Sequence, residues 1–469
     1  MRGDFLLAVK ETVKRFNELR QNKPIRIVSH MDCDGLSSAA ILSNAFYRHN
    51  IKFVLSMVRF LDNNVLEELS KEPYDLFIFS DIGSSYLKDI EKHLGSKSVF
   101  ILDHHMFEDS RTKAVHLNPH AYGIHDYAEV SGSGVAYFFS KSLDEANMDL
   151  SYIALIGAIG DIQEKNGFTG LNQIILEDAI SSGKISLTKG LKLFGTQTRP
   201  LHKALEYSID PYIPGVTGSE DGAMLFLNEL NISMRNKDNT YKKVIDLTEE
   251  ELKQLVTGII LRRLGSEENP EDIFGPVYSI TSEEEGSTTR DAKEYSTLLN
   301  CCARLGKPSI GLGTFFKNKK AMENATGLLS TYKKEIIISL DWFHKNRKTT
   351  SIMEKHGYVI INAEDNVRDT LIGTLASMIS KLNLYDLGTI ILSMAHSANE
   401  TKISLRLVGY KDVDLRGILQ KIVGKVGNHI VGGHKIACGA LIPQEKEFEF
   451  IKIADQMLSK FVLEENIAI

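Results

Sequence analysis

The feature that most constrains the fold is a series of four short, almost wholly apolar segments in the first 105 residues, with helical stretches between them. The segments are 25–28, 53–58, 75–80 and 98–102. Near-continuous apolar strands that alternate with helices are typical of a parallel sheet covered on both faces. In such sheets, ligands bind beyond the carboxyl ends of the strands. We therefore predict an α/β fold with a functional site at that edge.

Acidic residues and histidines follow three of the four segments directly. They form the motifs Ser29–Gly35, Asp81–Gly83 and Asp103–His105. Within the first motif, His30, Asp32 and Asp34 alternate along a loop that Gly35 helps to turn, so their side chains can face one point. Each motif also has an ordinary interpretation. Asp34 or Asp81 could cap the next helix, and one of two adjacent histidines usually makes a structural hydrogen bond.

Residues 130–194 are predicted to be helical, and they include an apolar, small-residue helix, 154–160, that ends at Asp161. A buried carboxylate without a partner is costly, so either a metal ion or a buried arginine should accompany Asp161. Together with the strand-end residues it supplies enough ligands for two divalent cations about 4 Å apart, bridged by a carboxylate and a water. Oxygen ligands with histidine favour Mn²⁺ or Mg²⁺ over structural zinc.

Composition limits the remaining possibilities. The 469 residues are too many for one ordinary core, and 25% charged with 43% hydrophobic residues is typical of a soluble protein. No apolar run approaches the roughly 20 residues of a membrane span, and the charged N-terminal helix is no signal peptide, so we expect a cytoplasmic protein without a membrane partner. The four cysteines form no Cys-x-x-Cys pair, and no phosphate-binding P-loop is present.

Charge divides the chain further. Between Val216 and Glu285 there are 15 Asp and Glu against 7 Lys and Arg, a balance of −8 within a chain whose net charge is −6. This segment is interpreted as part of a mostly helical, acidic insertion. Strand-like segments resume at 358–361, 389–392 and 402–407. We therefore predict three parts, which are an α/β domain at 1–195, the insertion at 196–285 and a second α/β domain at 286–469.

The second domain carries a basic segment at 401–435, with seven Lys and Arg against two Asp. A polyanion needs such a patch. The segment ends in Gly432-Gly433-His434, where glycine backbone could approach a phosphate and His434 could bind it, although two glycines also commonly mark a plain turn. Arg406 is the natural partner, because arginine grips phosphate with a bidentate fork.

A helix-like segment, residues 290–304, lies near the start of this predicted domain. Its spacing places Asn300 and Arg304 on one face, with Arg290 near its start. The ordinary interpretation is a solvated helix face, and the alternative is that these residues bind substrate phosphates.

The ordered set of motifs resembles the DHH phosphoesterase superfamily, and within it the archaeal branch of the RecJ-type single-strand nucleases. The resemblance covers nearly all of the chain outside the insertion. It rests on His30-x-Asp32-x-Asp34-Gly35, Asp81-Ile-Gly, Asp103-His104-His105, Gly160-Asp161, Arg290…Asn300…Arg304, Ser404-x-Arg406 and Gly432-Gly433-His434.

The resemblance implies a manganese-dependent phosphodiesterase with its active site in the cleft between two α/β domains, and Mg²⁺ is the alternative metal. It implies that His105 lies beside the metals or touches the scissile phosphate and that Asp103 supports the site. His30 stands where many RecJ-type enzymes carry aspartate and other DHH enzymes carry histidine. The implied ligands of the two metal ions are Asp32, Asp34, Asp81 as the bridge, His104 and Asp161, with His30 in addition.

The resemblance also implies a function. The leading hypothesis is an exonuclease that hydrolyses single-stranded DNA in the 5′→3′ direction by two-metal activation of water, in replication or repair. One alternative is a 3′→5′ exonuclease for RNA or short oligonucleotides. Another is a replisome scaffold that binds the GINS complex or the replicative helicase complex and has nuclease activity as a secondary property. The resemblance does not include the oligonucleotide-binding domain of long bacterial RecJ, so we expect weaker binding of single strands and lower processivity than in that enzyme.

Overall fold

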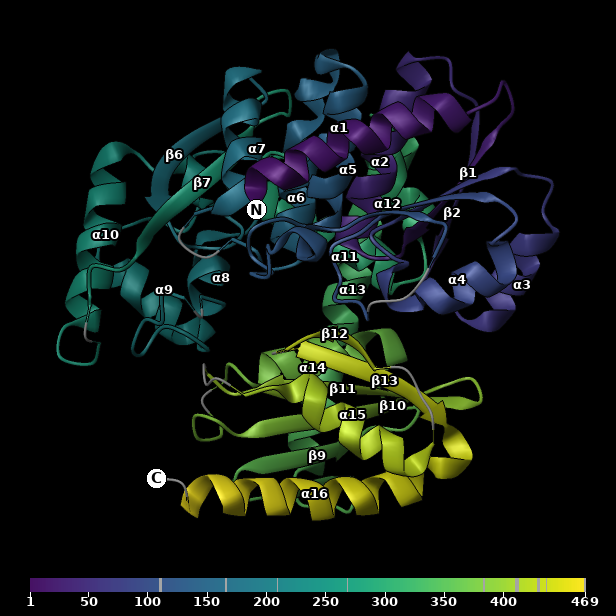
Figure 1. Cartoon of the computed structure of the whole chain (residues 1–469). Coiled ribbons are helices and arrows are strands. Elements are labelled where there is room, and N and C mark those ends of the chain that lie inside the picture. Colours follow the sequence, from purple (N-terminus) through teal and green to yellow (C-terminus); the bar gives the residue numbers. More distant parts are fainter. Residues whose placement is uncertain are drawn as a thin grey trace. The chain divides into compact units, whose positions relative to one another are not determined.

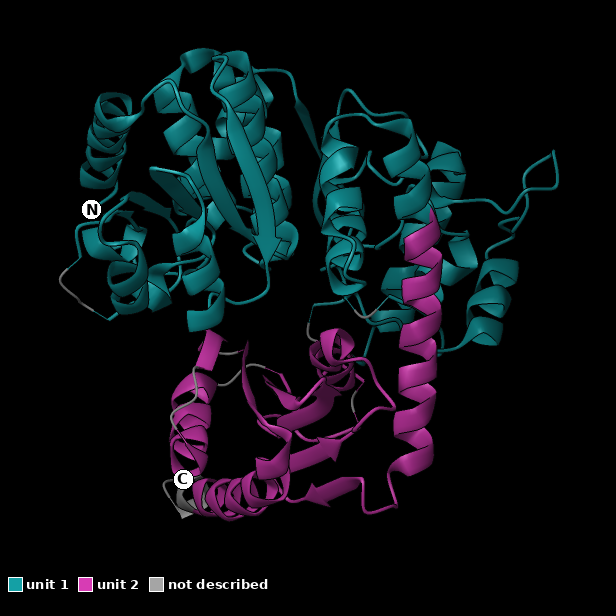
Figure 2. Cartoon of the chain, turned by 90° about the vertical axis from the view of Figure 1, so that its right-hand side faces the viewer, with its two compact units in different colours: residues 1–326 teal, residues 327–469 magenta. Residues whose placement is uncertain are grey.

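The computed structural model describes residues 1–108, 112–164, 167–208, 210–267, 269–382, 384–409, 413–427, 431–435 and 437–467. The chain divides into two compact units, Met1–Thr326 and Gly327–Ile469 (Figure 2). Within the described residues, every helix is too short or too polar to cross a membrane.

The first unit is built on a parallel sheet with the strand order β2-β1-β3-β4-β5 (Figure 1). Its central strands are buried throughout, because they consist of residues such as Val28, Phe77 and Ile101. The predicted parallel α/β architecture is confirmed, with one short edge strand that the sequence pattern did not indicate. The strands are β1 (Ile25–His30), β2 (Phe53–Val58), β3 (Leu76–Ser80), β4 (Ser98–Leu102) and the unexpected β5 (Val115–Leu117).

Helices cover both faces of this sheet. One face packs against α3 (Asn63–Lys71) and α4 (Leu87–Leu94), whose leucines join Phe77 and Phe79 in a common core. The other face is aromatic, and Phe16 stacks on Phe46 with ring centroids 5.5 Å apart. The helices on or behind that face are α1 (Arg2–Leu19), α2 (Cys33–Arg48), α5 (Gly132–Leu143) and α6 (Ser151–Gly160).

The helical prediction for 130–194 is wrong at its end. After α7 (Gly170–Ser181), residues Ile185–Leu191 form strand β6, which pairs antiparallel with β7 (Phe274–Ile280). The partner strand is distant in sequence, so local periodicity could not reveal the pairing. Between the two strands, a separate apolar core that includes Phe226, Leu227 and Ile259 holds α8 (Leu201–Glu206), α9 (Glu220–Glu229) and α10 (Glu249–Arg263).

Two further helices of the first unit, α11 (Ala292–Arg304) and α12 (Pro308–Phe315), precede α13 (Lys319–Asn346), which continues into the second unit. The second unit has a six-stranded sheet in the order β12-β13-β11-β10-β9-β8, antiparallel except between β9 and β10. Its elements are β8 (Ile352–Lys355), β9 (Tyr358–Asn362), α14 (Asp369–Ile379), β10 (Ile390–Ser397), β11 (Glu400–Leu407), α15 (Leu415–Val426), β12 (Val431–His434), β13 (Ala437–Pro443) and α16 (Glu447–Ile467).

Candidate metal centre

Asp32, which follows β1, caps a helix and also lies close to a histidine of the candidate site. Asp32 is the N-cap of α2, and its Oδ1 accepts a hydrogen bond from the Gly35 amide at 2.9 Å. Its Oδ2 lies 3.0 Å from Nδ1 of His30. Gly35 is required here, because a Cβ at this position would lie 2.0 Å from the His30 carbonyl oxygen. Of the two carboxylates in this loop, Asp32 rather than Asp34 caps the helix.

Asp34 is fully buried and is held by the N-terminus of α5. Its Oδ2 accepts from the Gly132 amide at 2.6 Å, and its Oδ1 accepts from the amide and the hydroxyl of Ser133. Backbone amides at a helix N-terminus are a natural anion cradle. Burial, together with the nearby Asp161 carboxylate, nevertheless raises the pKa of Asp34 to about 6. The raised pKa indicates that the hydrogen bonds to Asp34 do not fully offset its burial and the repulsion between its carboxylate and that of Asp161.

Asp81, after β3, points its two carboxylate oxygens at different histidines. Oδ2 lies 3.3 Å from Nδ1 of His30, and Oδ1 lies 3.4 Å from Nε2 of His104. Asp81 is 1% exposed, and its Oδ1 accepts no hydrogen bond from the part of the chain that the structure describes. Burial and the carboxylates of Asp34 and Asp32 raise its pKa well above the ordinary value. A cation is the missing partner that this geometry would accommodate.

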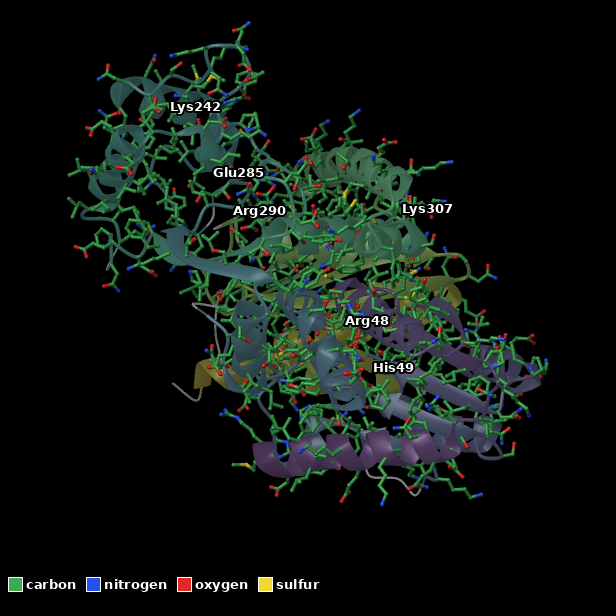
Figure 3. The ribbon with its side chains drawn as sticks, turned by 90° about the horizontal axis from the view of Figure 1, so that it is seen from above. Arg48, His49, Lys242, Glu285, Arg290 and Lys307 are labelled. Atoms are coloured by element: carbon green, nitrogen blue, oxygen red, sulfur yellow. The ribbon has the colours of Figure 1, made fainter. Side chains whose placement is uncertain are left out.

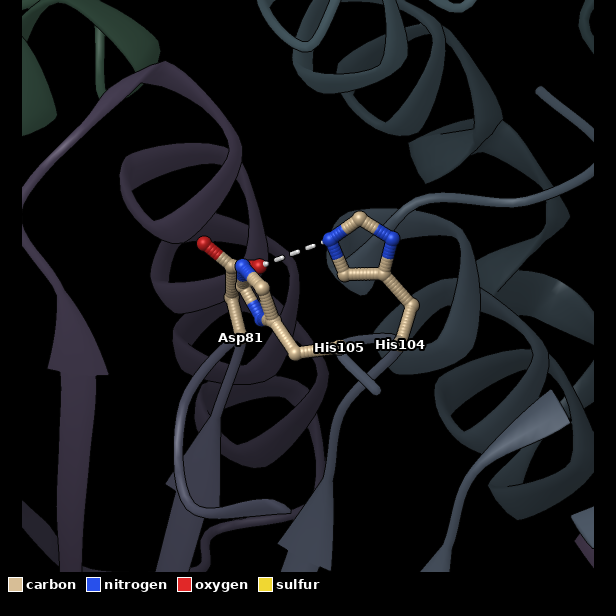
Figure 4. Close-up of side chains that lie close together, drawn as sticks. All are labelled: Asp81, His104 and His105. Atoms are coloured by element: carbon tan, nitrogen blue, oxygen red, sulfur yellow. Dashed lines mark ion pairs between the residues drawn. The ribbon is translucent and has the colours of Figure 1, made fainter. Parts of the chain in front are cut away.

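The imidazole of His104 lies close to the carboxylates of Asp161 and Asp34. Its Nε2 lies 3.2 Å from Oδ2 of Asp161 and 3.8 Å from Oδ2 of Asp34. Asp161 is the C-cap of α6. Its ion-pair partner is the imidazole of His104, rather than the buried arginine that the sequence left open. Burial alone would lower the pKa of His104, but Asp161 and Asp34 raise it to about 9. Figure 4 shows Asp81, His104 and His105 close together, with the ion pair between Asp81 and His104 dashed.

Asp103 lies behind the two histidines and organises their loop. Its Oδ1 accepts from the amides of His104 and His105 at 2.8 and 3.2 Å, and from Nδ1 of His105 at 2.8 Å. Its Oδ2 accepts from the Ser84 amide at 2.8 Å. Burial would raise the pKa of Asp103, but His105 and the donors hold it well below the ordinary range. The carboxylate therefore stays ionised and fixes the ring of His105.

These side chains form overlapping groups in which one ligand atom of each residue lies within 4.8 Å of the others. Asp81 belongs to two of the groups, as does His104, so neighbouring ions could share a ligand. Carboxylate oxygens and imidazole nitrogens suit Mn²⁺ and Mg²⁺. The groups are His30, Asp32 and Asp81; Asp34, His104 and Asp161; and Asp81, His104 and His105.

The predicted substrate residues of the first unit have specific contacts. Arg290 (Figure 3) precedes α11, and its Nη1 donates to the carbonyls of Ile280, Thr281 and Glu283 at 2.8 to 3.1 Å. Asn300 lies on α11 and accepts a hydrogen bond from the Cys33 amide through Oδ1 at 3.3 Å. The half-buried Arg304 ends the helix. Asn300 thus contacts the chain between Asp32 and Asp34, two of the candidate metal ligands.

In the second unit, Ser404 and Arg406 lie on β11. Nε of Arg406 donates to Oγ of Ser377 at 2.8 Å, and its Nη1 donates to Oγ of Ser404 at 2.9 Å. Gly432 and Gly433 lie on β12, and Gly433 has φ +100°, so that a Cβ there would lie 2.6 Å from the Ala437 carbonyl oxygen. The His434 side chain lies outside the described residues, as do Lys411 and Asp412 of the basic segment.

Sequence reasoning missed the residues that hold the ligands. Gly132 is one, because a Cβ there would lie 2.4 Å from Oδ1 of Asp81. Three polar residues belong to the same group, namely Ser133, Ser84 and Asn118. The side chain of Asn118 donates to the hydroxyl of Ser84 and to the His105 carbonyl, both at 2.8 Å. The small-residue run 131–134 before an apolar helix was the available signal, since such helix starts commonly bind anions.

Comparison with known proteins identifies the family. Models of the DHH family N-terminal domain, the DHH-CID domain and the DHHA1 domain match residues 24–160, 193–274 and 356–460. An uncharacterized protein of Methanocaldococcus jannaschii is 30% identical over 446 residues, which cover 93% of each chain. The chain belongs to the DHH family. The candidate metal ligands that the structure brings together lie within the first match or, for Asp161, one residue beyond it.

Solved structures show that this DHH protein has a RecJ-like fold. RecJ of Thermus thermophilus in complex with Mn²⁺ aligns with TM-score 0.59 and 14% identity over 97% of this chain, which spans only 55% of that protein. An exonuclease RecJ bound to manganese aligns with TM-score 0.56 and 14% identity, covering 96% and 94% of the two chains. Cdc45 of Entamoeba histolytica aligns with TM-score 0.66 and 13% identity, covering 96% and 99%.

Proposed function

We propose that this DHH protein is a metal-dependent exonuclease that hydrolyses single-stranded DNA to nucleotides in the 5′→3′ direction. The observation that carries the proposal is the convergence of carboxylates and imidazoles at the ends of β1, β3 and β4, around an Asp81 oxygen that accepts no hydrogen bond from the described residues. A charged, buried cluster of this kind is costly unless cations bind it, and phosphodiester hydrolysis is a reaction that paired cations promote.

We assign one ion to His30, Asp32 and Asp81, and the other to Asp34, His104 and Asp161. Asp81 is the proposed bridge, because its two oxygens already face the histidines of the two groups. The preferred ion is Mn²⁺, with Mg²⁺ as the alternative. When bound, these ions lower the pKa of water and neutralise charge that develops on the phosphoryl group.

The remaining side chains position the groups that react. Asp103 binds Nδ1 of His105, which directs the opposite edge of the ring away from Asp103 and, in our proposal, toward the substrate phosphate. Asp34 is anchored on the start of α5, so it keeps its place while neighbouring charges change. In the second unit, the Arg406 guanidinium and the backbone of Gly432 and Gly433 are proposed to bind other phosphates of the single-stranded DNA.

End-labelled digestion tests the proposal directly. A single-stranded 30-mer labelled at either end, a matched duplex, an RNA 30-mer and a dinucleotide are incubated with Mn²⁺, Mg²⁺ or a chelator. We expect a 5′ label to appear at once as mononucleotide with single-stranded DNA and Mn²⁺, and no cleavage with chelator. Release of a 3′ label, or preference for RNA or the dinucleotide, would replace this proposal by an exonuclease for RNA or short oligonucleotides.

A scaffold is the second candidate function, and the alignment with Cdc45 over 96% of the chain favours it. That likeness concerns the fold, whereas the ligand set favours catalysis. In a scaffold, the insertion would dock a partner such as the GINS complex. Leu191 pairs with Phe274 in the β6–β7 ribbon, so a short turn in place of residues 192–273 would connect the two strands directly. Unchanged GINS binding by this variant would exclude the insertion as the docking element.

A further inference from the structure

A hydrogen bond joins α11 to the loop of metal ligands. The Cys33 amide donates to Oδ1 of Asn300 at 3.3 Å. Asn300 is distant in sequence from this loop and belongs to none of the segments that the three DHH-related models match. Both residues lie within the first compact unit. The contact is therefore a long-range tie to the part of the chain that carries Asp32 and Asp34.

The amide that Asn300 binds would otherwise lack a helical partner. Cys33 is the first residue of α2, and the first amides of a helix have no carbonyl in their own helix to bind. The N-cap side chain of Asp32 already binds the Gly35 amide. Asn300 thus adds a cap to α2 from another helix, and it does so between the two carboxylates that we assign to the ions.

The Cys33 side chain is fixed in the same place. Its Sγ contacts Oγ of Ser296 at 3.6 Å and the Ile156 carbonyl oxygen at 3.5 Å. Gly160 provides the space, since a Cβ there would lie 2.6 Å from Cβ of Cys33. Ser296 and Asn300 are four positions apart and therefore lie on one face of α11.

We propose that Asn300 is a positioning residue, which holds the Asp32–Asp34 loop in the geometry that binds metal, rather than a residue that grips substrate. This inference rests on the proposed metal centre. It differs from the substrate role that sequence resemblance implies for Asn300, because the side chain oxygen is engaged by the loop itself. Residues that orient metal ligands typically change metal affinity or activity by about 10- to 100-fold when they are replaced.

Two substitutions separate the two roles. Asn300→Ala removes the acceptor, whereas Asn300→Asp keeps an acceptor oxygen but replaces the amide donor by a negative charge. For a positioning residue, Mn²⁺ affinity measured by electron paramagnetic resonance falls about tenfold or more in the alanine variant and returns to within about threefold of wild type in the aspartate variant. Turnover falls in the alanine variant, while KM for single-stranded DNA stays near the wild-type value.

Hydrogen exchange of the metal-free protein provides a readout that does not depend on the ion. The Cys33 amide loses protection in Asn300→Ala and keeps it in Asn300→Asp. Asn44→Ala is the matched control, because Asn44 lies on α2 and its side-chain amide donates to the Ala40 carbonyl of the same helix at 2.8 Å. This control leaves Mn²⁺ affinity and Cys33 protection unchanged.

The opposite pattern would overturn the inference. If both Asn300 variants bind Mn²⁺ like wild type, keep Cys33 protected and raise KM, Asn300 contacts substrate instead. If wild type itself binds no Mn²⁺, the proposed function fails. The exchange experiment still decides in that case whether Asn300 holds the loop.

Discussion

The two units place their charged residues in contrasting ways. In the first unit, short loops after parallel strands carry Asp32, Asp81 and His104 to one buried edge, where carboxylates approach each other closely. In the second unit, Arg406 lies along a strand of a mostly antiparallel sheet, and neighbouring hydroxyls and carbonyls bind its guanidinium. The first arrangement concentrates carboxylates and imidazoles where bound cations would neutralise the negative charge, whereas in the second the Arg406 guanidinium is hydrogen-bonded by neighbouring protein groups.

This contrast teaches what each region can do. Parallel strands end side by side, so their loops converge on a point where a small ion fits. Residues along an antiparallel strand form a row, which suits a repeating polyanion such as a phosphate backbone. Substitutions in the first region should therefore alter metal affinity and turnover, and substitutions in the second should alter substrate affinity.

Asp81→Asn should have the largest effect. It removes the charge that we place between the two ions, which is worth several kcal/mol of transition-state stabilisation, so kcat/KM should fall about 10³-fold or more. The metal-free protein should not lose stability, because burial and the neighbouring carboxylates already disfavour ionised Asp81. Steady-state kinetics and thermal unfolding measure both effects. Activity within tenfold of wild type would refute the assignment of Asp81 as the bridge.

Asp103→Asn should have a smaller effect of the same kind, about 10- to 100-fold in kcat, because Asp103 orients His105 and the loop. The amide keeps one acceptor oxygen for the backbone donors but no longer stabilises a positive charge on His105. Mn²⁺ affinity, measured by electron paramagnetic resonance, should change less than in Asp81→Asn. If Asp103→Asn abolishes Mn²⁺ binding, Asp103 is a ligand and not a support.

Arg406→Lys should raise KM for single-stranded DNA about tenfold and leave kcat within about threefold, because lysine replaces a planar fork by a point charge. The matched control is Arg347→Lys, since Arg347 is paired with Glu354 at 2.7 Å in the same unit. Kinetics at several salt concentrations distinguish the two variants. A fall in kcat without a change in KM would contradict the division of labour between the units.

The smallest effect should be on the pH dependence of stability without metal. The pKa of His104 is raised from 6.5 to about 9, so its stabilising ion pairs are fully present below pH 6.5 and are lost as the pH rises toward 9. The pKa of Asp34, raised from 3.8 to about 6, acts in the same direction at lower pH. Tm of the metal-free protein should therefore be lower at pH 9 than at pH 6.5, by about 1–2 °C for each kcal/mol in a unit of this size.

Manganese should reverse this trend. Metal binding must displace the proton of His104, so Mn²⁺ affinity should rise as the pH rises to about 9, and Mn²⁺ should raise Tm more at pH 9 than at pH 6.5. His104→Asn is the control in which both pH dependences should weaken. A Mn²⁺ affinity that is independent of pH in the wild type would argue against His104 as a ligand.

Much of the fold could be predicted because local runs of apolar residues indicate where its strands lie. The segments 53–58 and 98–102 form β2 and β4 with those bounds, since near-continuous apolar runs favour parallel strands, although only β4 is largely buried and β2 lies at the edge of the sheet. Strand β6 escaped prediction because its partner, β7, lies beyond the whole insertion. The short edge strand β5 has too few residues to give a pattern of its own.

The candidate site was predictable to a similar extent and for similar reasons. The sequence by itself determined which residues can bind metal, because Asp32, Asp81 and His104 stand where apolar segments end, and parallel strands end at a common edge. Only the tertiary structure decided which groups hold and face each of these side chains. Helix α5 holds Asp34, the two oxygens of Asp81 face different histidines, and Asn300 on α11 ties down the Cys33 amide. These contacts join residues far apart in the chain, and their geometry is set by packing, which no local pattern records.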